Sequence, residues 1–246
     1  MSKHKFYGWI PDVLDQRDYL YWAIAPVVKL PLSIDLRSVC SLVENQGDLG
    51  SCTANALAGN LEFLDNKIDQ VYQDVSRLFI YYNERLLEGT VDYDSGASLR
   101  DGIKTLVKTG CCWEKTWPYL VKFFTKKPSL HCYQEAKSHC IQSYHRISTL
   151  PEMLTCLTEG YPFVFGFSVY ESFESRRVAQ TGLVRMPKKD ERMLGGHAVM
   201  GVGFNQKKKR FLVRNSWGST WGQNGYFTMP FEYIETLAQD FWTIRK

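Results

Sequence analysis

The sequence predicts an α+β protein in which a mostly helical first half precedes a mostly stranded second half. Apolar residues recur at three-and-four spacing after residue 52, which is typical of an amphipathic helix. Past about residue 130 the pattern changes to short apolar runs separated by glycine-rich or charged turns, which is typical of strands. With 246 residues, of which 44% are hydrophobic, the chain can bury one large core or two lobes that share one, and disorder is excluded.

Three helices are predicted in the first half. The first begins at Cys52, with Gly50 and Ser51 as its turn and possible cap. The second covers residues 76–87 and the third covers residues 98–109. The apolar face of the first helix consists of Ala54, Leu57, Ala58, Leu61 and Leu64.

The second half is predicted to hold one short helix and several strands. The helix covers residues 151–159, where Pro151 suits a first helical position. The most apolar run reads as a buried strand, and the others end at glycine-rich or charged turns. The predicted strands are residues 163–169, 197–204, 210–215 and 225–229.

We divide the chain into an N-terminal arm and two lobes. Residues 1–31 contain three prolines and mixed charge without sustained periodicity, which indicates an extended arm. Residues 32–130 form the predicted helical lobe, and residues 131–246 form the predicted β-rich lobe. Since clefts form where lobes meet, we expect the functional site at their junction.

Composition and charge exclude several classes of function. The formal net charge of +4 arises from 30 basic and 26 acidic residues spread along the chain, so we expect no nucleic-acid surface. No apolar run is long enough to span a membrane, and the first 18 residues lack the apolar stretch of a signal peptide. We therefore expect no membrane partner, and the compartment stays open between the cytoplasm and export by a leaderless route.

Cys52 is the candidate nucleophile. In a first helical turn its thiolate is stabilised by the helix dipole, and a nearby imidazolium lowers its pKa further. His197 lies 145 residues downstream and Asn215 lies 163 downstream, so the base and its orienting group come from a distant part of the fold. A single cysteine in an apolar helix is often inert core, but the flanking Gln46 and Ser51 favour catalysis.

These features resemble the papain-like cysteine peptidases over about residues 32–235. The likeness depends on several short motifs that occur in the family's order. The arm, from residue 7 to residue 19, resembles bacterial and archaeal members that lack a long inhibitory propeptide. The motifs are residues 45–54, 117–119, 195–199, 215–222 and 225–227.

The resemblance implies a two-lobe fold, with a helical first lobe, an antiparallel barrel-like second lobe and the active-site cleft between them. It implies that Cys52 attacks the scissile carbonyl and that His197 protonates the leaving amine. Asn215 would orient the imidazole, and Trp217 would shield that hydrogen bond from water. The Gln46 side chain and the Cys52 backbone N–H would form the oxyanion hole.

The resemblance also predicts substrate-binding residues, and it has departures. Gly96 and Ala97 match a glycine pair on the family's cleft wall, whose backbone pairs with an extended substrate, and with Trp217 they are the predicted substrate-binding residues. Leu49 stands where the family has a half-cystine, so its first disulfide is absent. Thr53 stands where the family usually has tryptophan.

The pairing of the cysteines stays open at this point. Seven cysteines are an odd number and too few for a disulfide scaffold, so at least one thiol stays free or pairs with another molecule. The lack of a signal peptide favours reduced thiols, but the disulfide state of the six cysteines other than Cys52 is not determined by the sequence. His–Cys pairs at residues 131–132 and 139–140 suggest zinc only as a minor alternative, because no paired C-x-x-C spacing supports it. We therefore expect neither a metal nor another cofactor.

The arm has two possible roles. Papain-like peptidases commonly carry a long helical propeptide, and the 31 residues before the core are too few for one. The arm is expected either to brace the second lobe, with Trp9 and Tyr19 packed down, or to act as a short autoinhibitory plug.

Together these observations predict a monomeric cysteine endopeptidase that acts on peptide or protein substrates. A thiolate–imidazolium pair of Cys52 and His197 would form an acyl-thioester that water hydrolyses. Two alternatives stay open. One is an acyltransferase or deamidase that uses the same thioester, and the other is a non-catalytic binding protein with an occluded cleft.

Overall fold

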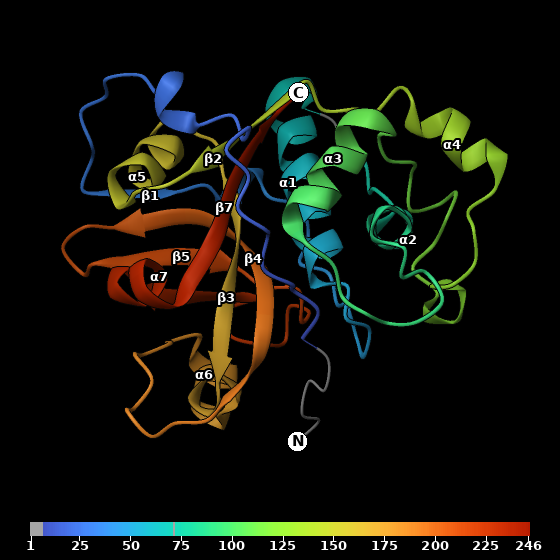
Figure 1. Cartoon of the computed structure of the whole chain (residues 1–246). Coiled ribbons are helices and arrows are strands. Elements are labelled where there is room, and N and C mark those ends of the chain that lie inside the picture. Colours follow the sequence, from blue (N-terminus) through green and yellow to red (C-terminus); the bar gives the residue numbers. More distant parts are fainter. Residues whose placement is uncertain (1–6, 71) are drawn as a thin grey trace.

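The α-helices of the first half gather on one side of the computed structural model, and the sheet lies on the other (Figure 1). The structure describes residues 7–70 and 72–246, so the first six residues of the predicted arm lie outside the described residues. The helices of the first half are α1 (Cys52–Asp69), α2 (Arg77–Glu88), α3 (Leu99–Lys108) and α4 (Leu130–Ala136). None of the described helices is long and apolar enough to cross a membrane.

The sheet has seven antiparallel strands. Six come from the second half and follow the order β2-β7-β3-β4-β5-β6, and β1, from the first half, pairs with β4 off this path. Three short helices flank it: α5 (Leu150–Thr158), α6 (Arg176–Thr181) and α7 (Phe231–Leu237). The strands are β1 (Ser33–Asp35), β2 (Ser143–Ile147), β3 (Phe163–Tyr170), β4 (Met193–Asn205), β5 (Arg210–Arg214), β6 (Tyr226–Pro230) and β7 (Ala238–Arg245).

The four predicted helices and four predicted strands are all present. The first and last residues of α2, α3 and α5 each differ from the predicted ones by one residue. α1 begins at Cys52 as predicted, and no end was predicted for it. β4 begins at Met193, four residues before the predicted start, because residues 193–196 already pair with β3. The sequence analysis misses three of the described strands, β1, β2 and β7, and three of the described helices, α4, α6 and α7. The three helices have only six or seven residues, β1 has three, and β7 carries polar side chains that interrupt its apolar alternation.

Contact between α1 and β4 joins the two halves at the site. One buried apolar cluster surrounds α1 and includes Ala198 of β4. A second cluster, rich in aromatic side chains, lies within the sheet and its flanking helices. Because β4 contributes to both clusters, the start of α1 is held against the middle of this strand.

A buried carboxyl group lies behind the start of α1. The hydroxyl of Thr53 donates a hydrogen bond to Glu84 Oε2 of α2 at 2.9 Å, and neither residue is exposed. Complete burial raises the pKa of Glu84 well above its usual value. Thr53 stands where the resemblance predicts tryptophan, and burial favours the neutral form of the Glu84 carboxyl.

The Glu84→Gln substitution tests this neutral carboxyl. A raised pKa in the folded state means that unfolding releases a proton, so Glu84 costs stability progressively as the pH rises above about 4.5. We expect the free energy of unfolding of the wild type to fall with pH more steeply than that of Glu84→Gln, by up to about 1.4 kcal/mol per pH unit. Urea titrations at pH 5, 7 and 9 measure it.

The exposed Glu235→Gln substitution in α7 serves as the control, and its pH dependence should match that of the wild type. Parallel curves for Glu84→Gln and the wild type would contradict the neutral carboxyl.

Candidate active site

Cys52 is the first residue of α1, as the sequence predicts. Ser51 occupies the N-cap position, but its hydroxyl makes no capping bond and instead lies 2.5 Å from the Tyr119 hydroxyl. Tyr119 also donates a hydrogen bond to the carbonyl of Gln46 at 2.9 Å. Tyr119 therefore ties the loop before α1 to the segment of residues 117–119.

His197 and Asn215 meet across β4 and the end of β5. His197 Nε2 donates a hydrogen bond to Asn215 Oδ1 at 2.8 Å, and both side chains are buried. This bond assigns the Nε2–H tautomer, so Nδ1 is the nitrogen that can exchange a proton. The Trp217 ring stacks on the imidazole with centroids 5.0 Å apart, which shields the hydrogen bond.

Gln46 joins the two sides of the site. Its Nε2 donates a hydrogen bond to the Leu49 carbonyl at 2.9 Å, and its Oε1 accepts one from the Ser216 hydroxyl at 2.6 Å. Asn45 forms an isolated bridge with Trp217. The loop before α1 is thereby fixed to the loop after β5, and the structure brings Gln46 close to Asn215 and Trp217.

The N-terminal arm runs between the helices of the first half and the sheet (Figure 1). Ala97 N donates a hydrogen bond to the Gly8 carbonyl at 2.8 Å, and Ile10 N donates one to the Ala97 carbonyl at 2.9 Å. On the other wall, Trp9 N donates to the Gly196 carbonyl at 3.1 Å. The cleft wall predicted to pair with substrate, at Gly96 and Ala97, is therefore paired with the arm.

Gly8 lies at the narrowest point of this contact. A Cβ atom on Gly8 would lie 1.7 Å from the carbonyl oxygen of Gly50, so no larger residue fits there without displacement. The backbones of Gly8 and of Ala198 on β4 both lie close enough to the sulfur of Cys52 to oppose the rise in the pKa of its thiol. The arm thus covers the nucleophile directly.

The predicted lowering of the Cys52 pKa is wrong for this conformation. The side chain is 0% exposed, and burial raises the pKa of its thiol to about 11, although the backbone hydrogen bonds from Ala198 and Gly8 oppose the rise. Desolvation outweighs the favourable position at the helix start. The sulfur of Cys52 is sealed from water, so this conformation does not hold a reactive thiolate.

The aromatic residues of the arm behave differently from one another. Trp9 is buried, with 6% exposure, as predicted, whereas Tyr19 is 66% exposed and the prediction that it packs down is wrong. Tyr7, which the sequence analysis overlooked, lies edge-on to the His197 ring with centroids 6.2 Å apart. Its hydroxyl donates a hydrogen bond to Glu174, so Tyr7 covers the histidine as Gly8 covers the cysteine.

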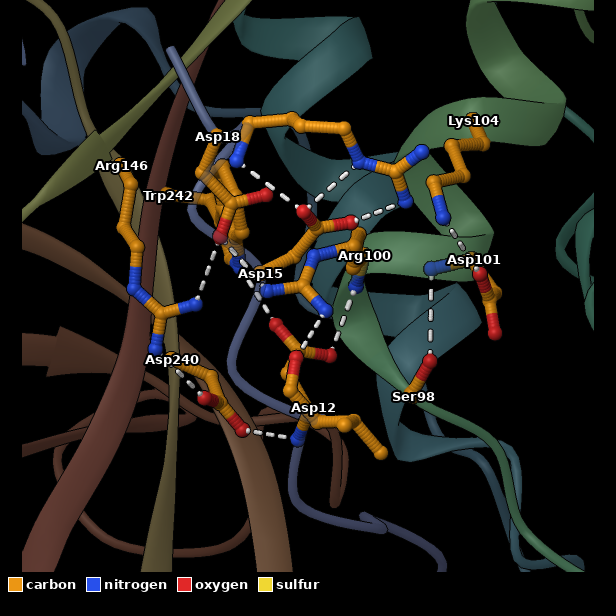
Figure 2. Close-up of polar contacts among 12 residues, drawn as sticks. Asp12, Asp15, Asp18, Ser98, Arg100, Asp101, Lys104, Arg146, Asp240 and Trp242 are labelled. Atoms are coloured by element: carbon orange, nitrogen blue, oxygen red, sulfur yellow. Dashed lines mark hydrogen bonds and ion pairs between the residues drawn. The ribbon is translucent and has the colours of Figure 1, made fainter. Parts of the chain in front are cut away.

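Two aspartates hold the arm against both lobes (Figure 2). Asp12 accepts hydrogen bonds from Arg100 N of α3 at 3.1 Å and from Trp242 Nε1 of β7 at 2.8 Å. Asp18 Oδ2 forms ion pairs with Arg100 Nη2 at 2.6 Å and with Arg146 Nη1 of β2 at 3.0 Å. Each aspartate therefore connects the helical side to the sheet.

Asp240 completes this network. Its Oδ2 accepts a hydrogen bond from Asp12 N at 2.8 Å, and its Oδ1 pairs with Arg146 Nη2 at 3.2 Å. Burial, followed by the charge of Asp12, raises the pKa of Asp240 to about 6. We use the term arm clamp for the residues Asp12, Asp18, Arg100, Arg146, Asp240 and Trp242.

Sequence reasoning identifies the four residues with predicted catalytic roles but not the arm clamp. Aspartates and arginines scattered over residues 12–240 carry no local signal of contact, because their partners are set by the fold. The adjacent Tyr7, Gly8 and Trp9 offered a weak signal, since two large rings flanking a glycine suit a narrow groove.

The cysteine and histidine pairs outside the cleft form no metal site within the described residues. His139 Nε2 lies 3.0 Å from Asp65 Oδ2 and is engaged in that pair. All seven cysteines, which lie within the described ranges, are free. Cys111, Cys112 and Cys132 are buried in the core around α1.

Comparison with known proteins gives concordant results. The family described as "Papain family cysteine protease" matches residues 30–236. The chain is 44% identical over 269 residues to the "Uncharacterized peptidase C1-like protein L477" of Acanthamoeba polyphaga mimivirus, covering 98% of this chain and 86% of that protein. It is 25% identical over 212 residues to "Cysteine proteinase 3" of Entamoeba histolytica, covering 83% and 64% of the two chains.

Among solved structures, the crystal structure of Xylellain, a cysteine protease from Xylella fastidiosa, is similar with a TM-score of 0.90 and 42% sequence identity. The similarity covers 99% of this chain and 97% of that chain. The likeness to Xylellain and to the mimivirus protein therefore extends over almost the whole chain, arm included.

The Asp18→Asn substitution tests the arm clamp. It leaves the buried Arg100 and the half-buried Arg146 without their shared carboxylate, although Arg146 keeps Asp240. Breaking a buried pair, as at Arg100, typically costs about 3–5 kcal/mol. We expect iodoacetamide to alkylate Cys52 at least about tenfold faster, because each 1.4 kcal/mol of weaker docking multiplies the open population by about ten. Mass spectrometry of the labelled peptide measures the rate.

Asp15→Asn is the matched control on the same arm. Within the described residues, the ion pair of Asp15 is with Arg17, whose side chain is exposed. This substitution should leave the rate unchanged. We also expect Asp18→Asn to lower Tm, because the arm links both lobes. Unchanged labelling together with unchanged Tm would contradict both the plug and the brace.

Proposed function

Because the chain belongs to the papain family of cysteine proteases, we propose that it hydrolyses peptide bonds with Cys52 as nucleophile and that its own arm keeps it latent. The observation that supports this proposal is the His197–Asn215 hydrogen bond, together with the packing of α1 against β4, whose Ala198 backbone lies close to the sulfur of Cys52. Release of the arm would turn this buried arrangement into an open site.

The reaction follows from the chemistry of these groups. With the arm released, Cys52 transfers its proton to His197 Nδ1, and the thiolate attacks the substrate carbonyl. The imidazolium then protonates the leaving amine, and an acyl-thioester remains on the sulfur. Water, activated by the neutral imidazole, hydrolyses the thioester and restores the thiol. Asn215 acts throughout by accepting the Nε2–H bond that orients the ring.

Gln46 is suited to stabilise the oxyanion. One N–H of its side-chain amide is engaged by the Leu49 carbonyl, and the second is available to a developing negative charge. The Ser216 hydroxyl holds the amide from its oxygen side, which favours the orientation with Nε2 toward the nucleophile loop. The backbone N–H of Cys52, in the first turn of α1, supplies the second donor.

Latency follows from what the arm covers. The backbone of Gly8 lies close to the sulfur of Cys52, and the Tyr7 ring lies edge-on to His197. Both the backbone N–H and the carbonyl of Ala97 are hydrogen-bonded to the arm. A substrate that pairs with the same wall has to displace these residues. The arm and an extended peptide therefore compete for one groove.

The sealed sulfur also favours a second candidate, a non-catalytic binding protein with an occluded cleft. In that case the arm would remain in place and Cys52 would stay unreactive in every variant that folds. An acyltransferase or deamidase would share the reactive Cys52 and differ only in what attacks or leaves the thioester. The two experiments below separate these possibilities.

The pH profile of Cys52 alkylation tests latency. With the arm docked, a pKa of about 11 leaves a thiolate fraction of roughly 10⁻⁴ at pH 7. We expect alkylation of the full-length wild type to increase with pH up to the limit of measurement. In Asp18→Asn it should reach a plateau several pH units lower, because release exposes the sulfur and the helix dipole then lowers its pKa.

The sign of the linkage agrees with this expectation. The docked state holds the thiol proton more tightly than the released state does, so docking is favoured at low pH and weakens as the pH rises towards 11. Cys140, which is partly exposed and outside the cleft, serves as the internal control. Identical profiles for Cys52 in both proteins would contradict a latent nucleophile.

Cleavage of a peptide library by Asp18→Asn tests the activity. We expect hydrolysis that Cys52→Ala abolishes in the same background, and that Gln46→Ala slows by about 10²–10³ in kcat through loss of one oxyanion donor. Mass spectrometry of the products identifies the reaction. Ammonia release without chain cleavage would indicate a deamidase, and amide exchange would indicate a transferase. Absence of any turnover despite rapid labelling of Cys52 would contradict the peptidase, the deamidase and the transferase alike.

A further inference from the structure

An exposed apolar segment follows the part of the arm that lies against the active site. Residues 22–32 contain one charged residue, Lys29, and otherwise only apolar residues and proline. Ala25 and Leu30 pack against the aromatic-rich cluster of the sheet, whereas four larger side chains of the segment are exposed. These four are Trp22, Ile24, Val27 and Leu32, with relative exposures of 64%, 50%, 105% and 63%. The fold thus anchors this segment and presents apolar side chains to the outside.

A basic hairpin tip lies against the end of this segment. The turn between β4 and β5 contains three consecutive exposed lysines, at residues 207–209. Gln206, which precedes them, donates a hydrogen bond from its backbone N to the Leu32 carbonyl at 2.9 Å and another from Nε2 to the Pro31 carbonyl at 2.6 Å. The loop of residues 24–32 and this hairpin lie at the same edge of the molecule, on the left in Figure 1.

Apolar and basic side chains that are distant in sequence therefore share one surface. We use the term basic–apolar edge for the residues Trp22, Ile24, Val27, Lys29, Leu32, Lys207, Lys208 and Lys209.

An open pocket of about 460 Å³ lies beside this hairpin and is lined by residues of β1 and β5. Its lining includes the cationic side chains of Arg37, Lys208 and Arg210. Among the lining residues the one carboxylate is Asp35, and it pairs with Arg37 at 2.7 Å. Positive charge exceeds negative charge in this lining, so the pocket attracts a phosphate group of the size found in a lipid headgroup.

The combination of charge and apolar surface suits a bilayer with anionic headgroups. Lysines near such a surface are attracted to it, and apolar side chains, tryptophan among them, partition into the boundary between headgroups and acyl chains. Val27 is 105% exposed, so it protrudes instead of lining a groove. A protein partner would need a shape complementary to such protruding side chains, whereas a bilayer accepts them one by one. A nucleic acid would use the lysines and leave the apolar side chains in water.

We propose that the basic–apolar edge binds the surface of anionic membranes, with its apolar side chains inserted at the interface and the lysines of the tip on the headgroups. The expectation of no membrane partner came from the lack of a segment long enough to span a bilayer, and binding at a membrane surface needs no such segment. The inference goes beyond the proposed peptidase function and does not depend on it.

Vesicle sedimentation of the full-length protein tests the proposal. The vesicles consist of phosphatidylcholine alone or of equal parts of phosphatidylcholine and phosphatidylserine. We expect the protein to sediment with the anionic vesicles and to stay in the supernatant with the neutral ones. Binding should weaken as the salt concentration rises, because salt screens exposed charges.

The variant Lys207→Gln/Lys208→Gln tests the basic tip. It should lower the partition coefficient on anionic vesicles by about fivefold per lysine, or about 25-fold in total, because each lysine near such a surface contributes about this factor. Lys209 is left unchanged, since its φ of 50° lies in the left-handed region and a substitution there would also test the turn.

The matched control is Lys126→Gln/Lys127→Gln, which removes the same charge from an exposed pair of lysines shortly before α4. α4 lies at the opposite edge of the molecule in Figure 1, so this variant should bind like the wild type. Equal losses in the two lysine variants would show attraction by net charge alone and would overturn the assignment to the basic–apolar edge.

The variant Trp22→Ser/Val27→Ser tests the apolar side chains. It should lower the partition coefficient by at least about tenfold through the loss of apolar burial, and its loss relative to the wild type should persist at high salt, where that of the lysine variant fades. Because both side chains are largely exposed, we expect Tm to stay close to that of the wild type. If Tm falls, Val27→Ser alone replaces the double variant.

Three further outcomes would overturn the proposal. One is absence of sedimentation with anionic vesicles at low salt. Another is equal binding to neutral and anionic vesicles. The third is binding to soluble heparin as tight as to vesicles and unchanged in Trp22→Ser/Val27→Ser, which would identify a site for soluble polyanions. Since none of these measurements uses hydrolysis or labelling of Cys52, failure of the peptidase proposal would leave them interpretable.

Discussion

The site depends on the packing of the first turn of α1 against β4. This contact brings Cys52 close to the backbone of Ala198, the residue that follows His197, although Cys52 and His197 are 145 positions apart in the sequence. The same contact sets two opposing effects on the thiol. The helix start favours a thiolate, whereas burial in the closed cleft favours the neutral thiol, and burial dominates while Gly8 covers the sulfur.

The arm is held by the features that suit the cleft to a peptide. The backbone of the arm is hydrogen-bonded to Ala97 and Gly196. Gly8 lies against the backbone of Gly50, and the Trp9 ring packs on the backbone of the two adjacent strands β3 and β4. Because arm and cleft belong to one chain, their association is intramolecular and has a high effective concentration. Modest contacts are therefore sufficient to keep the groove closed, and the arm clamp adds a second point of attachment beyond it.

Charge is buried where the arm joins the lobes and avoided at the nucleophile. Asp18 lies between two arginines, and Asp240 shares one of them, so the carboxylates at this junction are compensated. Behind Cys52, by contrast, Glu84 has a hydroxyl partner and a raised pKa. A neutral carboxyl at that place avoids a negative charge that would oppose thiolate formation once the cleft opens.

The sequence alone was sufficient to predict the longer helices, α1, α2, α3 and α5, four of the seven described strands and the candidate catalytic residues, because periodicity and short motifs are local properties of the chain. It also placed Trp9 in the interior. It could not predict that Cys52 is sealed, that Tyr19 is exposed, or that Asp12 and Asp18 join both lobes. Burial and ion pairing depend on residues that are far apart in the sequence and meet only in the folded chain. Only the tertiary structure therefore decided that Cys52 is buried and that its neutral thiol is favoured over the thiolate.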